Sequence, residues 1–277
     1  MPQPHNIIAV VFDYDKTLSP RYMQEDAIFR RFGIRPDEFW SRANVLVQTH
    51  HYESELAWMH LLLEHDGVAR CSNANVRAMG ADIAFYPGLP AALPEMRVIL
   101  ADDRYRQSGI QLEFYVVTSG LKELVEGSVL RPHLRAAFGC EFDERDGRIW
   151  RPKRTVSHTA KTQMLFRISK NLISMGEDVN QHMPAEARRI PFVNMIYVGD
   201  GPTDVPCFAV LKNYDGKSVA VYNPEDKKAF QTCYDLSVKS KRVDAMAAAD
   251  YRAGSQLRLV LERMILEIAD RIVERLK

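Results

Sequence analysis

Residues 7–12, with the sequence IIAVVF, limit how this chain can fold more than any other segment. The segment is short, rich in β-branched side chains and continuously apolar, which is typical of a strand buried on both faces of a parallel sheet. It ends abruptly at the polar sequence DYDKT, residues 13–17. Similar apolar runs lie at 112–117 and 192–198, and a weaker one lies at 218–222. These runs predict a buried parallel sheet.

Helical patterns separate the apolar runs, for example at 89–106 and 161–172. Alternating strands and helices favour right-handed βαβ crossovers, and hence a Rossmann-like, doubly wound parallel sheet of the α/β class. Two further polar clusters follow predicted strands, TSG at 118–120 and GDG at 199–201. Because open α/β sheets bind ligands at the carboxyl ends of their strands, we expect these clusters to meet at one functional site.

The strand pattern disappears between the first and the second of these polar clusters. Residues 25–32 and 53–63 instead show the spacing of apolar side chains that is typical of helices. We therefore predict an all-helical cap domain at 20–85, inserted into a catalytic core that consists of 1–19 and 86–277.

Three further segments carry structural predictions. An Asp-Gly pair at 146–147 lies between short apolar stretches and predicts a β-hairpin. Residues 174–191 are polar and predict an extended loop with at most one helical turn. Residues 255–277 predict a long helix with apolar side chains on more than one stripe. The second stripe can pack on the core or on another copy of the chain, so a monomer and a homodimer both stay open.

Composition and charge exclude several classes of partner. The 277 residues hold 37 Lys and Arg against 36 Asp and Glu, so no bulk charge attracts nucleic acid or an anionic membrane surface. The sequence contains no run of about 18 consecutive apolar residues, which a membrane span requires. The first six residues lack the features of a signal peptide. The four cysteines are far apart, which argues against a zinc site or a disulfide framework. We expect a cytoplasmic protein.

Paired carboxylates follow the first predicted strand. Asp13 and Asp15 are two residues apart, and Asp200 and Asp204 follow a later strand. This set of hard oxygen ligands suits Mg²⁺, which combines a few protein carboxylates with water and phosphate oxygens. A simpler alternative is that Asp13, Asp15 and Thr17 only cap the following helix.

The ordered set DYDKTL, VVTSG, Lys161 and VGDGPTD resembles the four sequence signatures of the haloacid dehalogenase superfamily. The resemblance covers the core strands and their loops, whereas the helical insertion matches only in its position and helical character. The helical insertion lies between the first two signatures, and in this position it resembles the cap of the phosphoserine-phosphatase-like branch. The resemblance implies a cap that closes over the site and excludes water.

The resemblance also implies roles for the acidic residues. Asp13 is the expected nucleophile and forms an aspartyl-phosphate, while Asp15 protonates the leaving oxygen and later activates water. The side chains of Asp13 and Asp200 and the backbone carbonyl of Asp15 are the expected Mg²⁺ ligands. Asp204 is expected to orient either the metal site or Lys161, and Thr17 to support the site from behind.

Further residues are expected to hold the phosphoryl group. The Thr118 hydroxyl and the amides of Ser119 and Gly120 are expected to donate to its oxygens, with Ser119 as an alternative to Thr118, and Lys161 adds a positive charge. The alternative for 118–120 is that these residues cap a helix that begins near Lys122. Lys153 and Lys170 are the alternatives to Lys161 for this role.

Substrate specificity is less defined by the sequence. Members of the resembled branch place a glutamate shortly after the first signature to hold the substrate amine. Here Tyr22 occupies that spacing, and Glu25 is slightly displaced. We keep both as candidate specificity residues and leave the physiological substrate open.

Together these features predict a Mg²⁺-dependent phosphatase that hydrolyses a small-molecule phosphomonoester through an aspartyl-phosphate. A phosphotransferase or phosphomutase of the same superfamily shares these signatures and stays open, because sequence does not separate water from another acceptor. A catalytically idle binding or assembly protein on this fold is the alternative from a different class.

Overall fold

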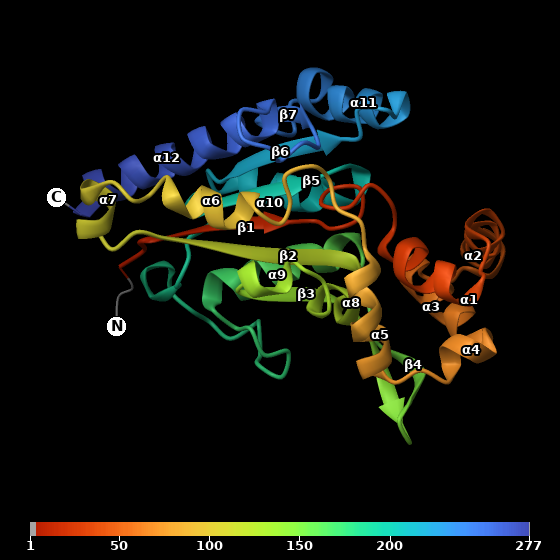
Figure 1. Cartoon of the computed structure of the whole chain (residues 1–277). Coiled ribbons are helices and arrows are strands. Elements are labelled where there is room, and N and C mark those ends of the chain that lie inside the picture. Colours follow the sequence, from red (N-terminus) through yellow and green to blue (C-terminus); the bar gives the residue numbers. More distant parts are fainter. Residues whose placement is uncertain (1–3, 277) are drawn as a thin grey trace.

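The computed structural model describes residues 4–276, which form a seven-stranded sheet with helices on both faces (Figure 1). The strand order is β4-β3-β2-β1-β5-β6-β7, and every neighbouring pair is parallel except β3 and β4. The strands are β1 (Ile7–Phe12), β2 (Gln111–Leu121), β3 (Ala136–Arg145), β4 (Arg148–Arg154), β5 (Met195–Gly199), β6 (Lys217–Tyr222) and β7 (Ala245–Ala248).

Strand β1 lies at the centre of the sheet, between β2 and β5. All six of its residues are buried, which explains why its sequence is continuously apolar. The chain builds outward from β1 on the β2 side and then returns to build outward on the β5 side. The carboxyl ends of β1 and β5 therefore form the topological switch point, where open α/β sheets bind ligands.

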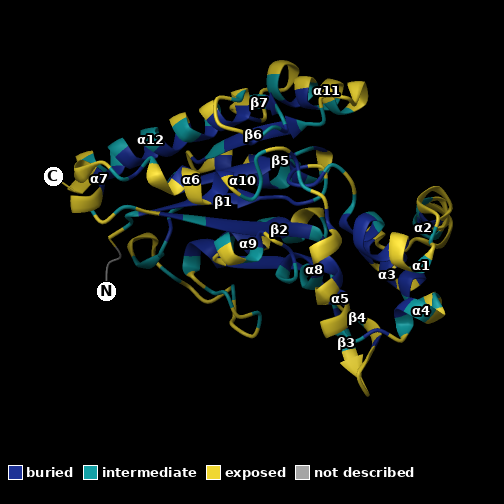
Figure 2. Ribbon diagram, in the orientation of Figure 1, coloured by how far each residue is buried: buried dark blue, intermediate teal, exposed yellow. Residues whose placement is uncertain are grey.

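Helices cover both faces of the sheet and one of its ends. The helices are α1 (Arg30–Phe32), α2 (Pro36–His50), α3 (Ser54–Glu64), α4 (Asp66–Ala69), α5 (Asn73–Met79), α6 (Ala92–Val98), α7 (Asp103–Gln107), α8 (Lys122–Glu126), α9 (His158–Lys170), α10 (Val205–Asn213), α11 (Lys227–Tyr234) and α12 (Gln256–Leu276). Helix α12 packs against α7 on one face, and α9 packs against α10 on the other. Buried residues concentrate in the sheet between these layers (Figure 2).

The helices α1–α4 lie beyond the carboxyl end of β1 and form a separate helical layer, and α5 leads back from it and packs against α8 of the core (Figure 1). The β3–β4 hairpin reaches this layer, since the Ile149 amide donates to the Cys71 carbonyl at 2.8 Å and the Asn73 amide to the Glu144 carboxylate at 2.7 Å. The predicted Rossmann-like core with a helical cap is confirmed. The exact boundaries of core and cap at 1–19, 20–85 and 86–277 stay predictions.

Several local predictions agree with the structure. The hairpin turns at Asp146 and Gly147, whose φ angles are 52° and 71°, values that Asp and Gly tolerate better than most residues. Between 174 and 191 the only helical segment is the 3₁₀ turn Ala185–Ala187. Helix α12 is continuous, with one stripe buried and a second that includes Leu259, which is 55% exposed.

Three local predictions are wrong in detail. The single helix expected at 89–106 is two helices, because the chain breaks after Val98 and Asp102 starts α7 by accepting a hydrogen bond from the Arg104 amide. The strand expected at 192–198 begins only at Met195, after a 3₁₀ turn. Strand β2 does not stop at residue 117 but continues, with an irregular register, through 118–120.

Two further features concern the helices and the cysteines. Within residues 4–276, no helix has the length and apolar character needed to cross a bilayer. Each of the four cysteines is buried and free, so none forms a disulfide in this fold.

Candidate active site

A cavity of about 340 Å³ lies where the carboxyl ends of β1 and β5 meet the helical layer. Its volume is near the lower end of the range for small-molecule sites, which runs from about 300 to 1,000 Å³. From the core it is lined by Asp13, Asp15, Lys16, Ser119, His158, Lys161 and 200–203, and from the helical layer by Tyr22, Gln24, Trp40, Ser54, Glu55 and Trp58.

Asp13 is the first residue after β1 and is firmly held. Its amide donates to the Val198 carbonyl at 2.8 Å, which extends the pairing between β1 and β5 by one residue. Its side chain is almost fully buried, and the Lys161 Nζ donates to its Oδ1 at 2.8 Å. Asp15 is turned toward the same cavity, with its Oδ1 accepting from the Met23 amide at 2.7 Å. The structure therefore brings both predicted carboxylates into one cavity.

Lys161 lies in the first turn of α9 and is only 1% exposed. Its Nζ donates at 2.8 Å to Asp13 Oδ1 and at 2.8 Å to Asp204 Oδ1. Burial acts to lower the pKa of Lys161, but the charges of Asp13 and Asp204 outweigh burial and raise it. The ammonium group therefore stays charged beside Asp13. Of the three lysines considered from sequence, Lys161 alone lines the cavity.

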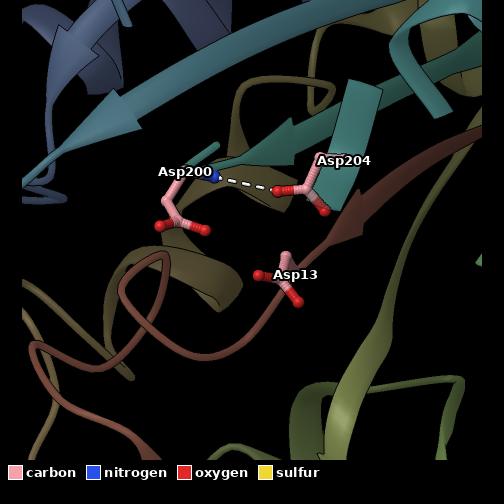
Figure 3. A group of neighbouring side chains, drawn as sticks. All are labelled: Asp13, Asp200 and Asp204. Carbon is pink, nitrogen blue, oxygen red and sulfur yellow. Dashed lines mark hydrogen bonds between the residues drawn. The ribbon is translucent and has the colours of Figure 1, made fainter. Parts of the chain in front are cut away.

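Asp204 is fully buried and has hydrogen bonds to both of its oxygens. Oδ1 accepts from Lys161 and from the Tyr197 hydroxyl, the latter at 2.7 Å, while Oδ2 accepts from the Asp200 amide at 3.1 Å (Figure 3). A Cβ at Gly199 would lie 2.4 Å from Asp204 Oδ2, so only glycine fits there. Asp204 thus holds Lys161 and the 200–201 loop in place.

The cavity floor concentrates negative charge. Asp13, Asp200 and Asp204 each offer a carboxylate oxygen, and these atoms lie within 4.8 Å of one another (Figure 3). Burial raises the pKa of Asp13 to about 6 against the opposing charge of Lys161. Burial, reinforced by the charge of Asp13, raises the pKa of Asp15 to about 8. Burial, reinforced by Asp204, also raises the pKa of Asp200. A divalent cation fits Asp13 and Asp200, because its charge favours the ionised carboxylates, whereas both oxygens of Asp204 already accept hydrogen bonds.

The three residues 118–120 do not all reach the cavity. Thr118 is fully buried, and its Oγ1 accepts from the Gly120 amide at 2.9 Å. Ser119 lines the cavity, but its Oγ donates to the Val156 carbonyl at 2.8 Å. Helix α8 has no side-chain cap, so the alternative in which 118–120 cap this helix is wrong. The predicted phosphate contacts of these residues stay predictions.

Tyr22 and Glu25 are separated by the structure. Tyr22 lines the cavity, and its hydroxyl accepts from Lys16 Nζ at 3.1 Å. Glu25 lies outside the lining, and its Oε1 accepts from Trp40 Nε1 at 2.7 Å. Thr17 is fully buried behind the site, with its carbonyl accepting from the Tyr251 hydroxyl at 2.8 Å.

Sequence reasoning missed Glu55, a cavity residue on α3. It is 4% exposed, and its Oε2 is buried without a hydrogen-bond partner among the described residues. A signal was present in the sequence, because Glu55, Trp58, Met59 and Leu62 fall on one helical stripe that is otherwise apolar. Burying an acid in such a stripe lowers the stability of the fold unless the acid has a hydrogen-bonding partner or a function in the site.

Solved structures with known folds resemble this chain along most of its length. A HAD family hydrolase of Salmonella enterica serovar Typhi has a TM-score of 0.58 at 17% identity, covering 94% of this chain and 72% of that one. A substrate-bound phosphoserine phosphatase has a TM-score of 0.55 at 17% identity, covering 92% and 97%. At these identities the likeness establishes the fold alone.

Two sequence comparisons relate this chain to other proteins. An uncharacterized protein of Borreliella burgdorferi is 27% identical over 296 residues, which cover 97% of this chain and all of that protein. The sequence model of the haloacid dehalogenase-like hydrolase family matches residues 10–209, a span that includes Asp13, Lys161 and Asp200. The chain therefore belongs to the haloacid dehalogenase-like hydrolase family.

Proposed function

We propose that this protein is a Mg²⁺-dependent phosphatase that hydrolyses a small-molecule phosphomonoester through an aspartyl-phosphate at Asp13. The observation that carries the proposal is the placement of Asp13 at the floor of the cavity, with Lys161 2.8 Å from one carboxylate oxygen and Asp15 in the same lining. The cavity volume of about 340 Å³ supports a small substrate.

The nucleophile is the Asp13 carboxylate. It attacks phosphorus while the bond from phosphorus to the leaving oxygen breaks, which gives an aspartyl-phosphate and a free alcohol. The contact between Asp13 and Lys161 supports this role, because the ammonium charge favours the ionised carboxylate despite its burial. Water then attacks phosphorus, and the acyl-phosphate splits into inorganic phosphate and the Asp13 carboxylate.

Asp15 is the general acid and then the general base. Its pKa of about 8, raised by burial and by the charge of Asp13, supports a carboxyl group that carries a proton at neutral pH. It gives that proton to the leaving oxygen in the first step. As a carboxylate it then takes a proton from the attacking water in the second step. The Met23 amide, 2.7 Å from Oδ1, fixes the direction in which this carboxyl group points.

Lys161 stabilises the transferred phosphoryl group. An ammonium group has three N–H donors, and Asp13 and Asp204 take two of them. The third is left for a phosphoryl oxygen, where a buried positive charge is most effective. Asp204 acts by positioning Lys161. The amide of Ser119 is the further donor that we assign to the phosphoryl group, since Ser119 lies in the cavity lining.

Mg²⁺ would be held by the side chains of Asp13 and Asp200 and by the Asp15 carbonyl. Asp204 is excluded as a direct ligand, since both of its oxygens already accept hydrogen bonds. When bound, the ion supplies Lewis-acid stabilisation of phosphoryl charge and fixes the orientation of the phosphate. We place the enzyme in the cytoplasm, since a reducing compartment keeps its four buried thiols free.

Phosphate release from an aryl phosphate tests this function. We expect wild-type turnover that requires Mg²⁺ and is lost on addition of EDTA, and that falls to background in Asp13→Asn. The matched control is Asp146→Asn, because Asp146 lies in the exposed hairpin turn and asparagine tolerates its φ of 52°. The proposal fails if wild type and Asp13→Asn release phosphate equally across a broad panel of phosphate esters.

A further inference from the structure

The end of strand β2, at residues 118–120, departs from regular pairing with β3. Between two paired positions, β2 advances four residues, from Val117 to Leu121, while β3 advances two, from Phe138 to Cys140. The 118–120 segment therefore bulges out of the ladder, and the pairing of the strands does not determine where its backbone groups point. Other contacts must hold this segment if one of its amides is to bind a phosphoryl group.

Side chains supply these contacts. Within the segment, the Gly120 amide donates to Thr118 Oγ1 at 2.9 Å. The Ser119 hydroxyl donates to the Val156 carbonyl at 2.8 Å, and the Ser119 carbonyl accepts from the Cys140 thiol at 3.2 Å. Ser119 is thus held both at its side chain and at its backbone by residues from other segments, which limits how its amide can turn.

Cys140 makes two of the contacts at this junction. It is fully buried, and besides donating to the Ser119 carbonyl its Sγ accepts from the Val156 amide at 3.3 Å. Burial raises the pKa of the Cys140 thiol to about 12, so the thiol keeps its proton and stays a donor at neutral pH. The hydrogen bonds among Ser119, Cys140 and Val156 close a ring that joins β2, β3 and the segment before α9.

Val156 connects this ring to Lys161. It lies five residues before Lys161, whose amide donates to the Ser157 carbonyl at 3.0 Å in the first turn of α9. The ring therefore sets the position of Ser119 relative to the helix that carries Lys161. In the proposed mechanism the Ser119 amide and the Lys161 ammonium group both donate to the phosphoryl group. Their spacing is important, because misplacing a group by about 1 Å can lower the rate about 100-fold.

We propose that Cys140 is a positioning residue for phosphoryl transfer, whose thiol holds Ser119 in place relative to Lys161 without touching the substrate. The inference deepens the proposed phosphatase function and rests on it. A thiol is a weak donor and a weak acceptor, so its effect lies in the geometry that it imposes. Donors aligned with the transition state raise kcat, and losing their alignment therefore lowers kcat more than it raises KM.

Three substitutions at Cys140 separate hydrogen bonding from packing. Serine keeps a donor and an acceptor in a smaller side chain, valine fills the space without either, and alanine does neither. With full-length protein, Mg²⁺ and an aryl phosphate, we expect Cys140→Ser to keep kcat within about fivefold of wild type. In Cys140→Val and Cys140→Ala we expect kcat to fall about 10- to 100-fold, with a smaller change in KM.

The matched control is Cys71→Ala. Cys71 is also buried, and its thiol donates to a backbone carbonyl, that of Gly67, at 3.5 Å. Cys71 lies outside the cavity lining and outside the ring, so we expect its replacement to keep the wild-type kcat.

Inhibition by vanadate gives a second readout, which a role in packing alone would not change. Vanadate adopts the five-coordinate geometry of phosphorus in the transition state. Its Ki should therefore rise in Cys140→Val and Cys140→Ala by about the factor by which kcat/KM falls. Inorganic phosphate resembles the ground state, so its Ki should change little in the same variants.

Each outcome decides the matter. Wild-type kcat and vanadate Ki in Cys140→Val overturn the assignment, and so does a Cys140→Ser that is no more active than Cys140→Val. If Cys140→Ala fails to fold, the comparison of these two variants decides. Turnover that depends on Asp13 but not on Cys140 removes the inference and leaves the phosphatase standing. If wild type releases no more phosphate than Asp13→Asn, the proposed function and this inference fall together.

Discussion

Replacing Lys161 by methionine removes the cation between two buried carboxylates while keeping a chain of similar length. Lys161 Nζ is 2.8 Å from Asp13 Oδ1 and 2.8 Å from Asp204 Oδ1, and the side chain is 1% exposed. Removing one partner of a buried ion pair costs about 3–5 kcal/mol of folding free energy, because the remaining charge stays buried without compensation. We expect a loss of this size at pH 8.

The loss should shrink in acid. Burial raises the pKa of Asp13 to about 6, although the positive charge of Lys161 opposes this shift. Removing the Lys161 charge therefore raises the pKa of Asp13 further. In the variant the native state therefore binds more protons than the unfolded chain above pH 4, so its stability falls as pH rises. Each pKa unit corresponds to about 1.4 kcal/mol. We expect a loss of about 1–2 kcal/mol at pH 5, where Asp13 is largely protonated in both proteins.

Urea unfolding with EDTA present, at pH 5 and at pH 8, measures both values by linear extrapolation. Lys153→Met is the matched control, because Lys153 is exposed and such changes stay within about 0.5 kcal/mol. A loss below about 1 kcal/mol at pH 8, or an equal loss at both pH values, would refute the view that Lys161 compensates buried charge.

Two further predictions concern the metal and the junction of cap and core. Mg²⁺ at 100 times its Kd at pH 8.5 should raise the free energy of unfolding by about 2.7 kcal/mol. The same Mg²⁺ concentration should raise it by less at pH 5.5, because protons on the ligand Asp13 compete with the ion, and equal thermal shifts at both pH values would contradict this. Gly127→Ala should lower the free energy of unfolding by at least about 1–3 kcal/mol in urea, because the new Cβ would lie 1.6 Å from the Arg77 carbonyl oxygen. The control is Gly176→Ala, which should be nearly neutral because the atom nearest to its new Cβ would be 3.9 Å away.

The central part of the fold could be predicted from the sequence because it obeys simple rules. A continuously apolar strand such as 7–12 fits only a sheet covered on both faces, and the carboxyl ends of parallel strands meet at one edge. These two rules suffice to bring Asp13 and Asp200 together. Strand β7 escaped prediction because its sequence, AMAA, carries no β-branched residue and its place depends on β6 beside it.

The site was less predictable where tertiary packing decides it. The sequence left open whether Asp204 orients the metal site or Lys161, because their pairing joins residues 43 positions apart and depends on how α9 approaches β5. Whether Thr118 or Ser119 faces the cavity depends on the irregular register at the end of β2, which no propensity encodes. Glu55 reaches the cavity only because the helical layer closes over the end of the sheet, a placement that the spacing of apolar residues on α3 does not define.

Direct detection of the covalent intermediate tests most sharply whether Asp13 attacks phosphorus. Wild-type protein turning over an aryl phosphate with Mg²⁺ is quenched in acid within milliseconds, treated with borohydride to reduce any acyl-phosphate, and mapped by peptide mass spectrometry. We predict that the aspartate-to-homoserine change appears at Asp13 and is absent without substrate. Reduction at Asp15 or at another residue instead, or turnover with no modified aspartate, would contradict the assignment of Asp13 as the nucleophile.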